Sequence, residues 1–357
     1  MPAPEAGAID CDLHPAVPSI KALLPYLDDH WRDMVVQRGV HELDSISYPK
    51  NAPVTARTDW KLDGGAKAGS DFRRLKVDAL DGFNLKFAIC NCLYGVQLLY
   101  TEDMAYAFAR AVNDWIVAEW LDRDPRLRAS IVVPPQNPDY AAAEIDRLAD
   151  DQRFVQVLML VMDEMPLGRR RYWPIYRAAE RHGLPIGVHA GSAYRHGVTS
   201  AGWPTYYAED SMAQAQAFQS ALSSFISEGV FAEFPELKIV FLESGFTWLP
   251  AHLWRLGKFW RGLRMEIPWV DRHPLEIARD HLRLTIQPCD APPSPGDLTR
   301  VIEHLGSDEM LLFSTDYPHW QYEGFEALPD GLDAAMARKI CVDNPLATYP
   351  RLKEATV

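Results

Sequence analysis

The chain lacks long apolar runs, a cysteine pattern and an excess of positive charge. No stretch of 18 or more apolar residues occurs, so no membrane span is expected. The five cysteines are odd in number and show no CxxC spacing, which argues against a disulfide scaffold or a structural zinc knuckle. The net charge of -13 argues against nucleic acid or an anionic membrane as the main partner. Neither a basic nor an apolar secretory signal region opens the chain, so cytoplasmic residence is expected.

The chain alternates between short apolar runs, typical of buried strands, and longer amphipathic segments. Its 357 residues, 48% of them hydrophobic, suit two average domains or one large α/β barrel with a sizeable core. The expected strands are Ala6–Asp12, Leu85–Asn91, Arg126–Pro134, Phe154–Val161, Pro185–His189, Lys238–Glu243, Leu282–Gln287 and Met310–Asp316. The clearest expected helices are Glu102–Leu121, Tyr140–Asp150, Pro174–His182, Ser211–Glu228 and Trp248–Leu263.

Nearly every expected strand is followed closely by a helical segment. This order predicts a parallel sheet covered by helices, and eight such units predict a single (β/α)8 TIM barrel over residues 1–357. Residues 15–81 and 192–210 do not fit the repeat and are predicted insertions over the C-terminal mouth. Both carry tryptophans, among them Trp60 and Trp203, which indicate pocket walls or subunit contacts. Ordinary surface excursions are the alternative.

Chemistry-bearing residues gather at the expected strand ends. In Asp12-Leu13-His14, residues i and i+2 of an extended strand, a carboxylate and an imidazole project from one face. Polar residues also end later strands: His189, Glu243, Gln287 and Asp316. The active site of a barrel lies at the C-terminal ends of its strands, so these side chains are expected to converge there. Imidazole and carboxylate are suitable ligands for zinc, manganese or iron.

Several strings resemble the amidohydrolase-related family, and more narrowly its branch containing aminocarboxymuconate-semialdehyde decarboxylase and the resorcylate-type decarboxylases. They are Ile9-Asp10-Cys11-Asp12-Leu13-His14, Pro185-Ile186-Gly187-Val188-His189, Phe234-Pro235-Glu236-Leu237-Lys238, Ser314-Thr315-Asp316-Tyr317-Pro318-His319 and Asn344-Pro345. The resemblance implies that Asp12, His14, His189 and Asp316 are the metal ligands. It also implies that Asp316 moves a proton, with a pKa that is depressed while a metal is bound.

One position departs from the family pattern. Related enzymes commonly place a catalytic histidine in a His-x-Gly string at the end of strand six, where this chain reads Leu242-Glu243-Ser244-Gly245. Glu243 could act as a general acid or base or as a further metal ligand, and an N-cap or a buried ion pair is the alternative without a function. Candidate substrate-binding residues, each with an ordinary structural alternative, are His319, Gln287, Arg195 and Trp203.

Together these features predict one divalent metal ion, with Zn²⁺ first and Mn²⁺ second. The leading hypothesis is a metal-dependent hydrolase in which activated water attacks a carbonyl-type small molecule while Asp316 and Glu243 shuttle protons. The substrate is expected to be aromatic or carboxylate-bearing. The alternative is a non-oxidative decarboxylase of an aromatic or unsaturated acid, and a third hypothesis is a non-catalytic ligand-binding barrel. Because related barrels are often dimers or larger, a homo-oligomer is expected.

Overall fold

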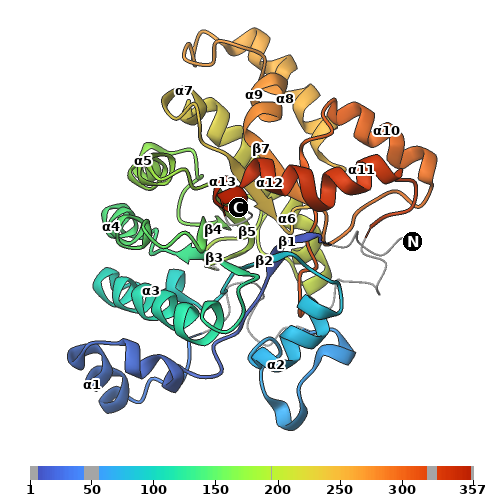
Figure 1. Cartoon of the computed structure of the whole chain (residues 1–357). Helices are drawn as coiled ribbons and strands as arrows, with labels where there is room; N and C mark the ends of the chain where they lie inside the picture. Colours follow the sequence, from blue (N-terminus) through green and yellow to red (C-terminus); the bar gives the residue numbers. More distant parts are fainter. Residues whose placement is uncertain (1–6, 44–55, 194, 320–327, 355–357) are drawn as a thin grey trace.

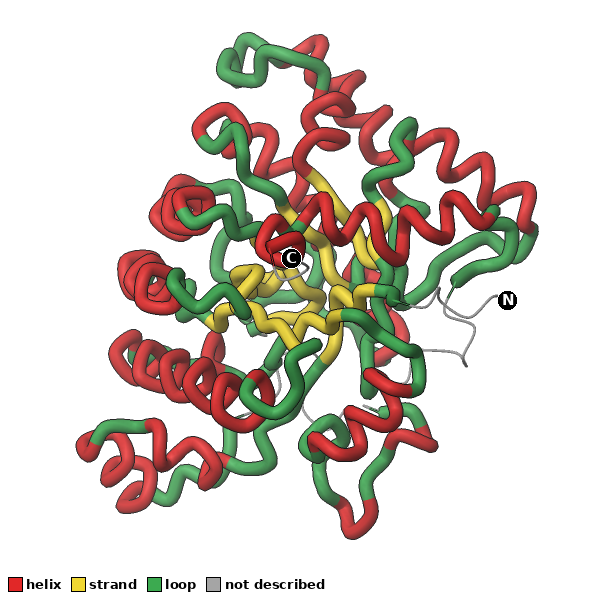
Figure 2. Tube along the Cα trace, viewed as in Figure 1, coloured by secondary structure: helices red, strands yellow, loops and turns green. Residues whose placement is uncertain are grey.

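One parallel sheet organises the protein. A computed structural model describes residues 7–43, 56–193, 195–319 and 328–354, and its eight strands are hydrogen-bonded in chain order (Figures 1 and 2). They are β1 (Ile9–Leu13), β2 (Phe87–Cys90), β3 (Leu127–Val132), β4 (Phe154–Met162), β5 (Ile186–Ser192), β6 (Ile239–Leu242), β7 (Leu282–Thr285) and β8 (Leu311–Leu312). Every neighbouring pair is parallel. The predicted (β/α)8 barrel and all eight expected strands are confirmed.

The last strand returns to the first. Leu13 forms a parallel bridge with Tyr317, and the backbone N–H of Asp316 donates to the carbonyl of Asp12 over 3.0 Å. These bonds bring the segment after β8 alongside β1 and close the sheet into a barrel. The predicted ligands Asp12 and Asp316 therefore lie on the two sides of this seam.

The helices form the outer layer around the strands (Figure 2). They are α1 (Asp29–Arg38), α2 (Phe72–Leu75), α3 (Glu102–Ile116), α4 (Pro138–Leu148), α5 (Trp173–Arg181), α6 (Tyr207–Ser227), α7 (Val230–Glu233), α8 (Leu249–Leu263), α9 (Pro274–His281), α10 (Pro295–Leu305), α11 (Ala334–Arg338), α12 (Asn344–Thr348) and α13 (Pro350–Glu354). Shorter 3₁₀ turns occupy Ile20–Tyr26, Thr58–Trp60, Asp63–Gly65, Val96–Leu98 and Arg170–Tyr172, and π turns Lys76–Asp81, Val117–Leu121 and Lys339–Asp343. Among the described helices, none has the length and apolarity needed to cross a membrane.

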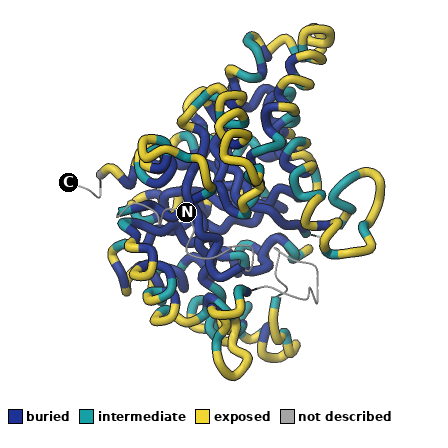
Figure 3. The backbone as a smooth tube through the Cα atoms, turned by 90° about the vertical axis from the view of Figure 1, so that its right-hand side faces the viewer, coloured by how far each residue is buried: buried dark blue, intermediate teal, exposed yellow. Residues whose placement is uncertain are grey.

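Local signals in the sequence set these helices. In α3, Met104, Phe108 and Val112 recur at a spacing of four and are buried against the barrel. The Asn137 side chain caps α4 by accepting from the backbone N–H groups of the helix's second and third residues. All nine residues of β4 are buried, as expected for a strand covered on both faces. Figure 3 shows this buried interior and its exposed rim.

The first expected insertion reaches the C-terminal end of the barrel. Within residues 15–81 the chain forms α1 and α2, while 44–55 lie outside the described residues. Trp60 is only 3% exposed, and its ring lies 4.8 Å from that of Tyr317. A Cβ at Gly69 would lie 2.5 Å from the carbonyl oxygen of His14, so only glycine permits this approach to the end of β1. Part of this segment thus walls the site from the β1–β8 side.

The second expected insertion is more exposed. Trp203 is 60% exposed, and Tyr194 lies outside the described residues. Thr199 and Gly202 form an antiparallel bridge that folds this loop on itself. The expected range of 192–210 overlaps α6, which already begins at Tyr207. Trp203 of the second segment is therefore far more exposed than Trp60 of the first.

The two C-terminal helices cover the opposite end of the barrel, which we call the floor. Figure 1 shows α12 and α13 lying across the centre of the strands. The Arg351 guanidinium donates to the carbonyls of Phe154 (2.7 Å), Ala149 (3.0 Å) and His182 (3.1 Å). Phe154 begins β4, so these bonds tie the C-terminal helices to the N-terminal ends of the strands.

Candidate metal centre

Six acidic and histidine side chains meet at the C-terminal end of the barrel, which we call the mouth. They come from β1 and the residue after it, from β5, and from the segments that follow β6 and β8, and are Asp12, His14, His189, Glu243, Asp316 and His319. All six side chains are at least about nine-tenths buried. They form two overlapping groups, each with the geometry to hold a metal ion. The four predicted ligands and Glu243 are thus brought together.

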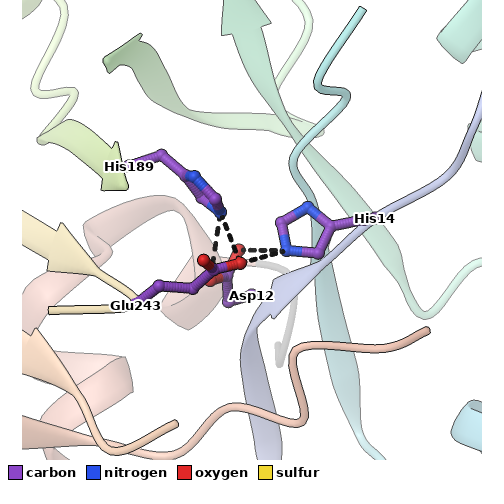
Figure 4. A group of neighbouring side chains, drawn as sticks. All are labelled: Asp12, His14, His189 and Glu243. Atoms are coloured by element: carbon purple, nitrogen blue, oxygen red, sulfur yellow. Dashed lines mark ion pairs between the residues drawn. The ribbon is translucent and has the colours of Figure 1, made fainter. Parts of the chain in front are cut away.

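The first group is shown in Figure 4. His14 Nε2 lies 3.3 Å from Asp12 Oδ1 and 3.6 Å from Glu243 Oε1. His189 Nε2 lies 3.1 Å from Glu243 Oε1 and 3.7 Å from Asp12 Oδ2. Two imidazoles from different strands therefore aim the same ring nitrogen at the same pair of carboxylates. The alternation along β1 delivers Asp12 and His14 to one face, as the spacing predicts.

Backbone carbonyls fix the outer nitrogens of both imidazoles. His14 Nδ1 lies 2.8 Å from the carbonyl of Asn91, and His189 Nδ1 lies 2.5 Å from the carbonyl of Ala190. A carbonyl only accepts, so each Nδ1 carries the hydrogen and each Nε2 faces the centre of the group. This is the arrangement in which histidine binds a metal ion through Nε2.

Several side-chain atoms that face the centre of the group have no hydrogen-bond partner within the described part of the chain, and a bound cation would coordinate them. Asp12 Oδ2, His14 Nε2, His189 Nε2 and Asp316 Oδ2 are buried and have no hydrogen-bond partner among the described residues. Buried polar atoms normally have such partners, because leaving one unpaired costs about 1–3 kcal/mol. Four unpaired atoms of ligand type at one point fit a divalent cation.

The second group adds His319. Its Nδ1 lies 2.5 Å from Asp316 Oδ1 and 3.1 Å from Glu243 Oε1, and its ring stacks on that of His14 at 4.5 Å. His319 therefore links the acid after β8 to the acid after β6. His319, predicted as a substrate-binding residue, is therefore part of the acid–histidine group itself.

Both acids stand on strained backbone. Glu243 and Asp316 have φ values of 59° and 55°, in the left-handed region that non-glycine residues rarely adopt. The Glu243 N–H donates to the Thr285 hydroxyl oxygen over 3.1 Å, which helps to hold this conformation. Such backbone costs on the order of 1–3 kcal/mol per residue and clusters at functional sites. The strain turns both carboxylates toward the histidines.

Burial and neighbouring charges together shift the pKa values of the group: those of His189 and Asp316 rise and that of Glu243 falls. Burial alone would lower the pKa of His189, but the carboxylates of Glu243 and Asp12 raise it to about 9. Burial and the Glu243 charge raise the pKa of Asp316 to about 6, against the opposing effect of His319 and His14. Burial also opposes ionisation of Glu243, yet His189 and His319 hold its pKa well below the usual range. Glu243 is thus the ionised acid and Asp316 the one that readily takes a proton.

Three predicted substrate-binding residues lie outside this group. The Gln287 side chain is buried, and its Oε1 accepts from the Cys289 N–H over 3.0 Å, so it caps its own loop. Arg195 pairs with the Glu164 carboxylate, and its guanidinium lies over the ring of Tyr100. Trp203 is mostly exposed. Their contact with substrate stays a prediction.

Sequence reasoning missed Asn91. This fully buried residue follows β2, and its Nδ2 donates to Asp12 Oδ1 over 2.7 Å. Its backbone carbonyl accepts from His14, so one residue contacts both ligands of β1. An amide at the end of an otherwise apolar strand is a signal that could have marked it.

A (β/α)8 barrel with carboxylates and imidazoles buried together at its mouth is typical of metal-dependent barrel enzymes. The chain belongs to the amidohydrolase family, whose model matches residues 9–351. The family resemblance inferred from the sequence is confirmed, and with it the assignment of the protein to the enzymes of this superfamily.

Similar proteins include decarboxylases. A gamma-resorcylate decarboxylase of Rhodococcus jostii is 25% identical over 281 residues, which are 74% of this chain and 82% of that protein. An amidohydrolase from Mycobacterium avium subsp. paratuberculosis has a similar structure, with a TM-score of 0.72, 19% identity and coverage of 96% and 99% of the two chains. A second similar structure is a 5-carboxyvanillate decarboxylase from Novosphingobium aromaticivorans, in complex with manganese and 4-hydroxy-3-methoxy-5-nitrobenzoic acid. Its TM-score is 0.70 and its sequence identity 18%, and the match covers 97% of this chain and 96% of that chain.

Proposed function

We propose that this protein is a metal-dependent, non-oxidative decarboxylase of an aromatic acid. The observation that carries the proposal is the likeness of most of the chain to gamma-resorcylate decarboxylases. The buried acid–histidine group at the mouth supplies the ligands that such a reaction needs. Decarboxylation, the alternative to hydrolysis in the sequence-based hypotheses, thus becomes the leading one.

The proposed ligands of the ion are Asp12, His14, His189 and Asp316. In the structure Glu243 shares one group with Asp12, His14 and His189, whereas Asp316 belongs to the overlapping second group, so Glu243 is the alternative fourth ligand. A divalent ion held there would supply positive charge for binding a substrate carboxylate. Manganese is the better candidate, because the carboxylate-rich donor set suits it and because a relative of similar structure holds manganese. Zinc, first in the sequence-based expectation, becomes the alternative.

The remaining residues handle the proton. Loss of CO2 leaves a carbon that must gain a proton, and a buried acid that is readily protonated can supply it. Asp316, buried at the mouth, is the proposed acid, and His319, whose Nδ1 lies 2.5 Å from Asp316 Oδ1, can return the proton to it between turnovers. Glu243, held ionised by His189 and His319, orients both imidazoles through contacts of 3.1 Å and does not donate the proton itself. The side chains of the group are at least about nine-tenths buried, which limits the access of water to the reacting carbon.

The test supplies 2,6-dihydroxybenzoate and 5-carboxyvanillate to the Mn²⁺-loaded protein and measures CO2. In D2O, the product should carry one deuterium at the carbon that lost its carboxylate. The matched control is the Asp316→Asn protein, loaded and assayed identically. If no acid of a wider hydroxybenzoate panel releases CO2, the decarboxylase proposal is wrong.

Hydrolysis remains the second candidate because Glu243 stands where related enzymes place a catalytic histidine. An ester and amide panel in H2¹⁸O separates the two reactions, since only hydrolysis incorporates ¹⁸O into the product. Release of CO2 without ¹⁸O uptake would eliminate the hydrolase. A non-catalytic barrel, the third hypothesis, predicts that metal-replete protein contains no stoichiometric ion.

Self-association is proposed as well. Trp254, Phe259 and Leu263 are exposed on α8, and Met265 and Trp269 follow it, each at least 39% exposed. Exposed apolar side chains along one segment are typical of an interface between subunits. Figure 1 shows α8 projecting from the barrel at the top. The molar mass in solution, measured by light scattering, decides between a monomer and a homo-oligomer.

A further inference from the structure

Four polar side chains run through the barrel interior beneath the metal centre. Asn91, Ser130, Gln156 and Tyr349 are each at most 1% exposed. They come from the end of β2, from β3, from β4 and from the floor. Their neighbours in the strands are apolar, so these residues break the pattern of the core. We call them the interior chain.

The hydrogen bonds of the interior chain all point one way. The Tyr349 hydroxyl donates to Gln156 Oε1 (2.9 Å), Gln156 Nε2 donates to Ser130 Oγ (2.9 Å), and the Ser130 hydroxyl donates to Asn91 Oδ1 (2.6 Å). Asn91 Nδ2 then donates to Asp12 Oδ1 over 2.7 Å. A second bond from Gln156 Nε2 to Asn91 Oδ1, of 3.3 Å, bypasses the serine. A directed series of donors thus leads from the floor to a carboxylate at the mouth.

This arrangement fixes the orientation of the Asn91 amide. Its oxygen accepts from two donors, Ser130 and Gln156, so its nitrogen must face Asp12. The barrel also leaves space for the chain: a Cβ at Gly187 would lie 2.4 Å from the Gln156 side-chain carbon Cδ. Any larger residue at this place in β5 would displace Gln156.

Asp12 needs such support. Its carboxylate is fully buried, and Asp10, another buried carboxylate, stands two residues away in the same strand. Burying an ionised carboxylate is costly unless donors or a cation compensate it. Hydrogen bonds that point in one direction polarise one another, so each donor strengthens the next. The donor at the end of the chain is therefore stronger than an isolated amide.

We propose that the interior chain is a positioning device for the metal centre: it holds the Asp12 carboxylate in place and turned toward the cation. Asn91 adds a second contribution, because its backbone carbonyl fixes the ring of His14. The proposal rests on the proposed metal site but not on the reaction. Tyr349, on the floor, thus influences cation binding without contacting any ligand.

The experiment measures Mn²⁺ binding to metal-stripped protein, by electron paramagnetic resonance of the free ion, without substrate. Asn91→Ala removes the last donor and should weaken binding by about 10–100-fold, the range for residues that orient metal ligands. Tyr349→Phe removes one distant hydroxyl and should weaken binding by on the order of fivefold, since one hydrogen bond is lost. Ser130→Ala should have a smaller effect than Asn91→Ala, because Gln156 still reaches Asn91.

Tyr176→Phe is the matched control. Tyr176 is equally buried, and its hydroxyl donates to the Leu167 carbonyl, outside the interior chain. This variant should lose thermal stability like Tyr349→Phe and yet bind Mn²⁺ like the wild type. Equal Mn²⁺ affinities of the two variants would overturn the proposal, as would a loss confined to Asn91→Ala.

The readout separates this inference from the proposed function. Wild-type protein that binds Mn²⁺ but releases no CO2 would contradict the decarboxylase and leave the interior chain testable by the same titrations. If Asn91→Ala fails to fold, Tyr349→Phe still decides, because it removes a single oxygen atom. Unfolding temperatures of the metal-free proteins identify any variant whose loss of binding follows from loss of structure.

Discussion

The mouth and the floor of the barrel treat buried polar groups in opposite ways. At the floor, Arg351 is 8% exposed and donates to backbone carbonyls from three separate segments. Asn344 likewise donates to the carbonyls of Asp308 and Leu311. At the mouth, by contrast, ligand-type atoms stay unpaired among the described residues, and two acids adopt left-handed backbone.

This difference separates what stabilises the fold from what serves chemistry. Satisfied hydrogen bonds at the floor lower the free energy of the folded chain, whereas unpaired atoms and strain at the mouth raise it. The mouth can carry that cost because a rigid, well-packed barrel holds it in place. Substitutions of floor residues outside the interior chain should therefore change stability, and substitutions in the acid–histidine group at the mouth should change function.

The largest expected effect tests the mouth. Asp316→Asn should lower turnover by about 10³-fold or more, because it removes a proposed ligand and proton donor in one step. The unfolding temperature of the metal-free protein should not fall, since the change removes a buried charge beside Glu243. Steady-state kinetics and thermal unfolding measure both, with Asp343→Asn, at an exposed ion pair, as the control. Near-normal turnover would exclude Asp316 from the mechanism.

The next effect tests the floor. Arg351→Ala should reduce the free energy of unfolding by about 3 kcal/mol, because it leaves several buried carbonyls unpaired. Mn²⁺ affinity and turnover per folded molecule should stay within about twofold of the wild type. Arg300→Ala, at an exposed pair within α10, should cost under about 1 kcal/mol in the same denaturant titration. Loss of turnover in folded Arg351→Ala protein would break the contrast between floor and mouth.

The smallest effect concerns another mouth acid, Asp163, directly after β4. Burial raises the pKa of its carboxyl to about 6, against Tyr172, Arg195 and other nearby groups. The folded state then holds its proton more tightly than the unfolded state, so this group lowers stability as pH rises from about 4 to 6. Asp163→Asn should be more stable than the wild type by about 1–2 kcal/mol at pH 8.

That gain should shrink as pH falls toward 4, where both states of the wild type become protonated. Thermal unfolding across this pH range measures it. An equal difference between Asp163→Asn and the wild type at every pH would show that ionisation of Asp163 is not the cause.

The sequence predicted the barrel because strand and helix patterns are local. The placement of Asp12, His14, His189 and Asp316 followed, since the C-terminal ends of parallel strands share one end of a barrel. Contacts that depend on side-chain torsion were beyond reach. Examples are the approach of His319 to both acids, the capping bond of Gln287 and the pairing of Arg195 with Glu164.

The seam between the first and last strands has a consequence for the order of folding. Asp10 and Thr315 are 305 positions apart, yet Asp10 accepts from both the backbone and the hydroxyl of Thr315. Asp12, His14 and Asp316 lie on either side of this seam, so the centre is complete only when the barrel closes. A chain still emerging from the ribosome, without its last strand, lacks Asp316 and His319 and has no closed cavity. The protein thus gains its chemistry only when synthesis is nearly finished.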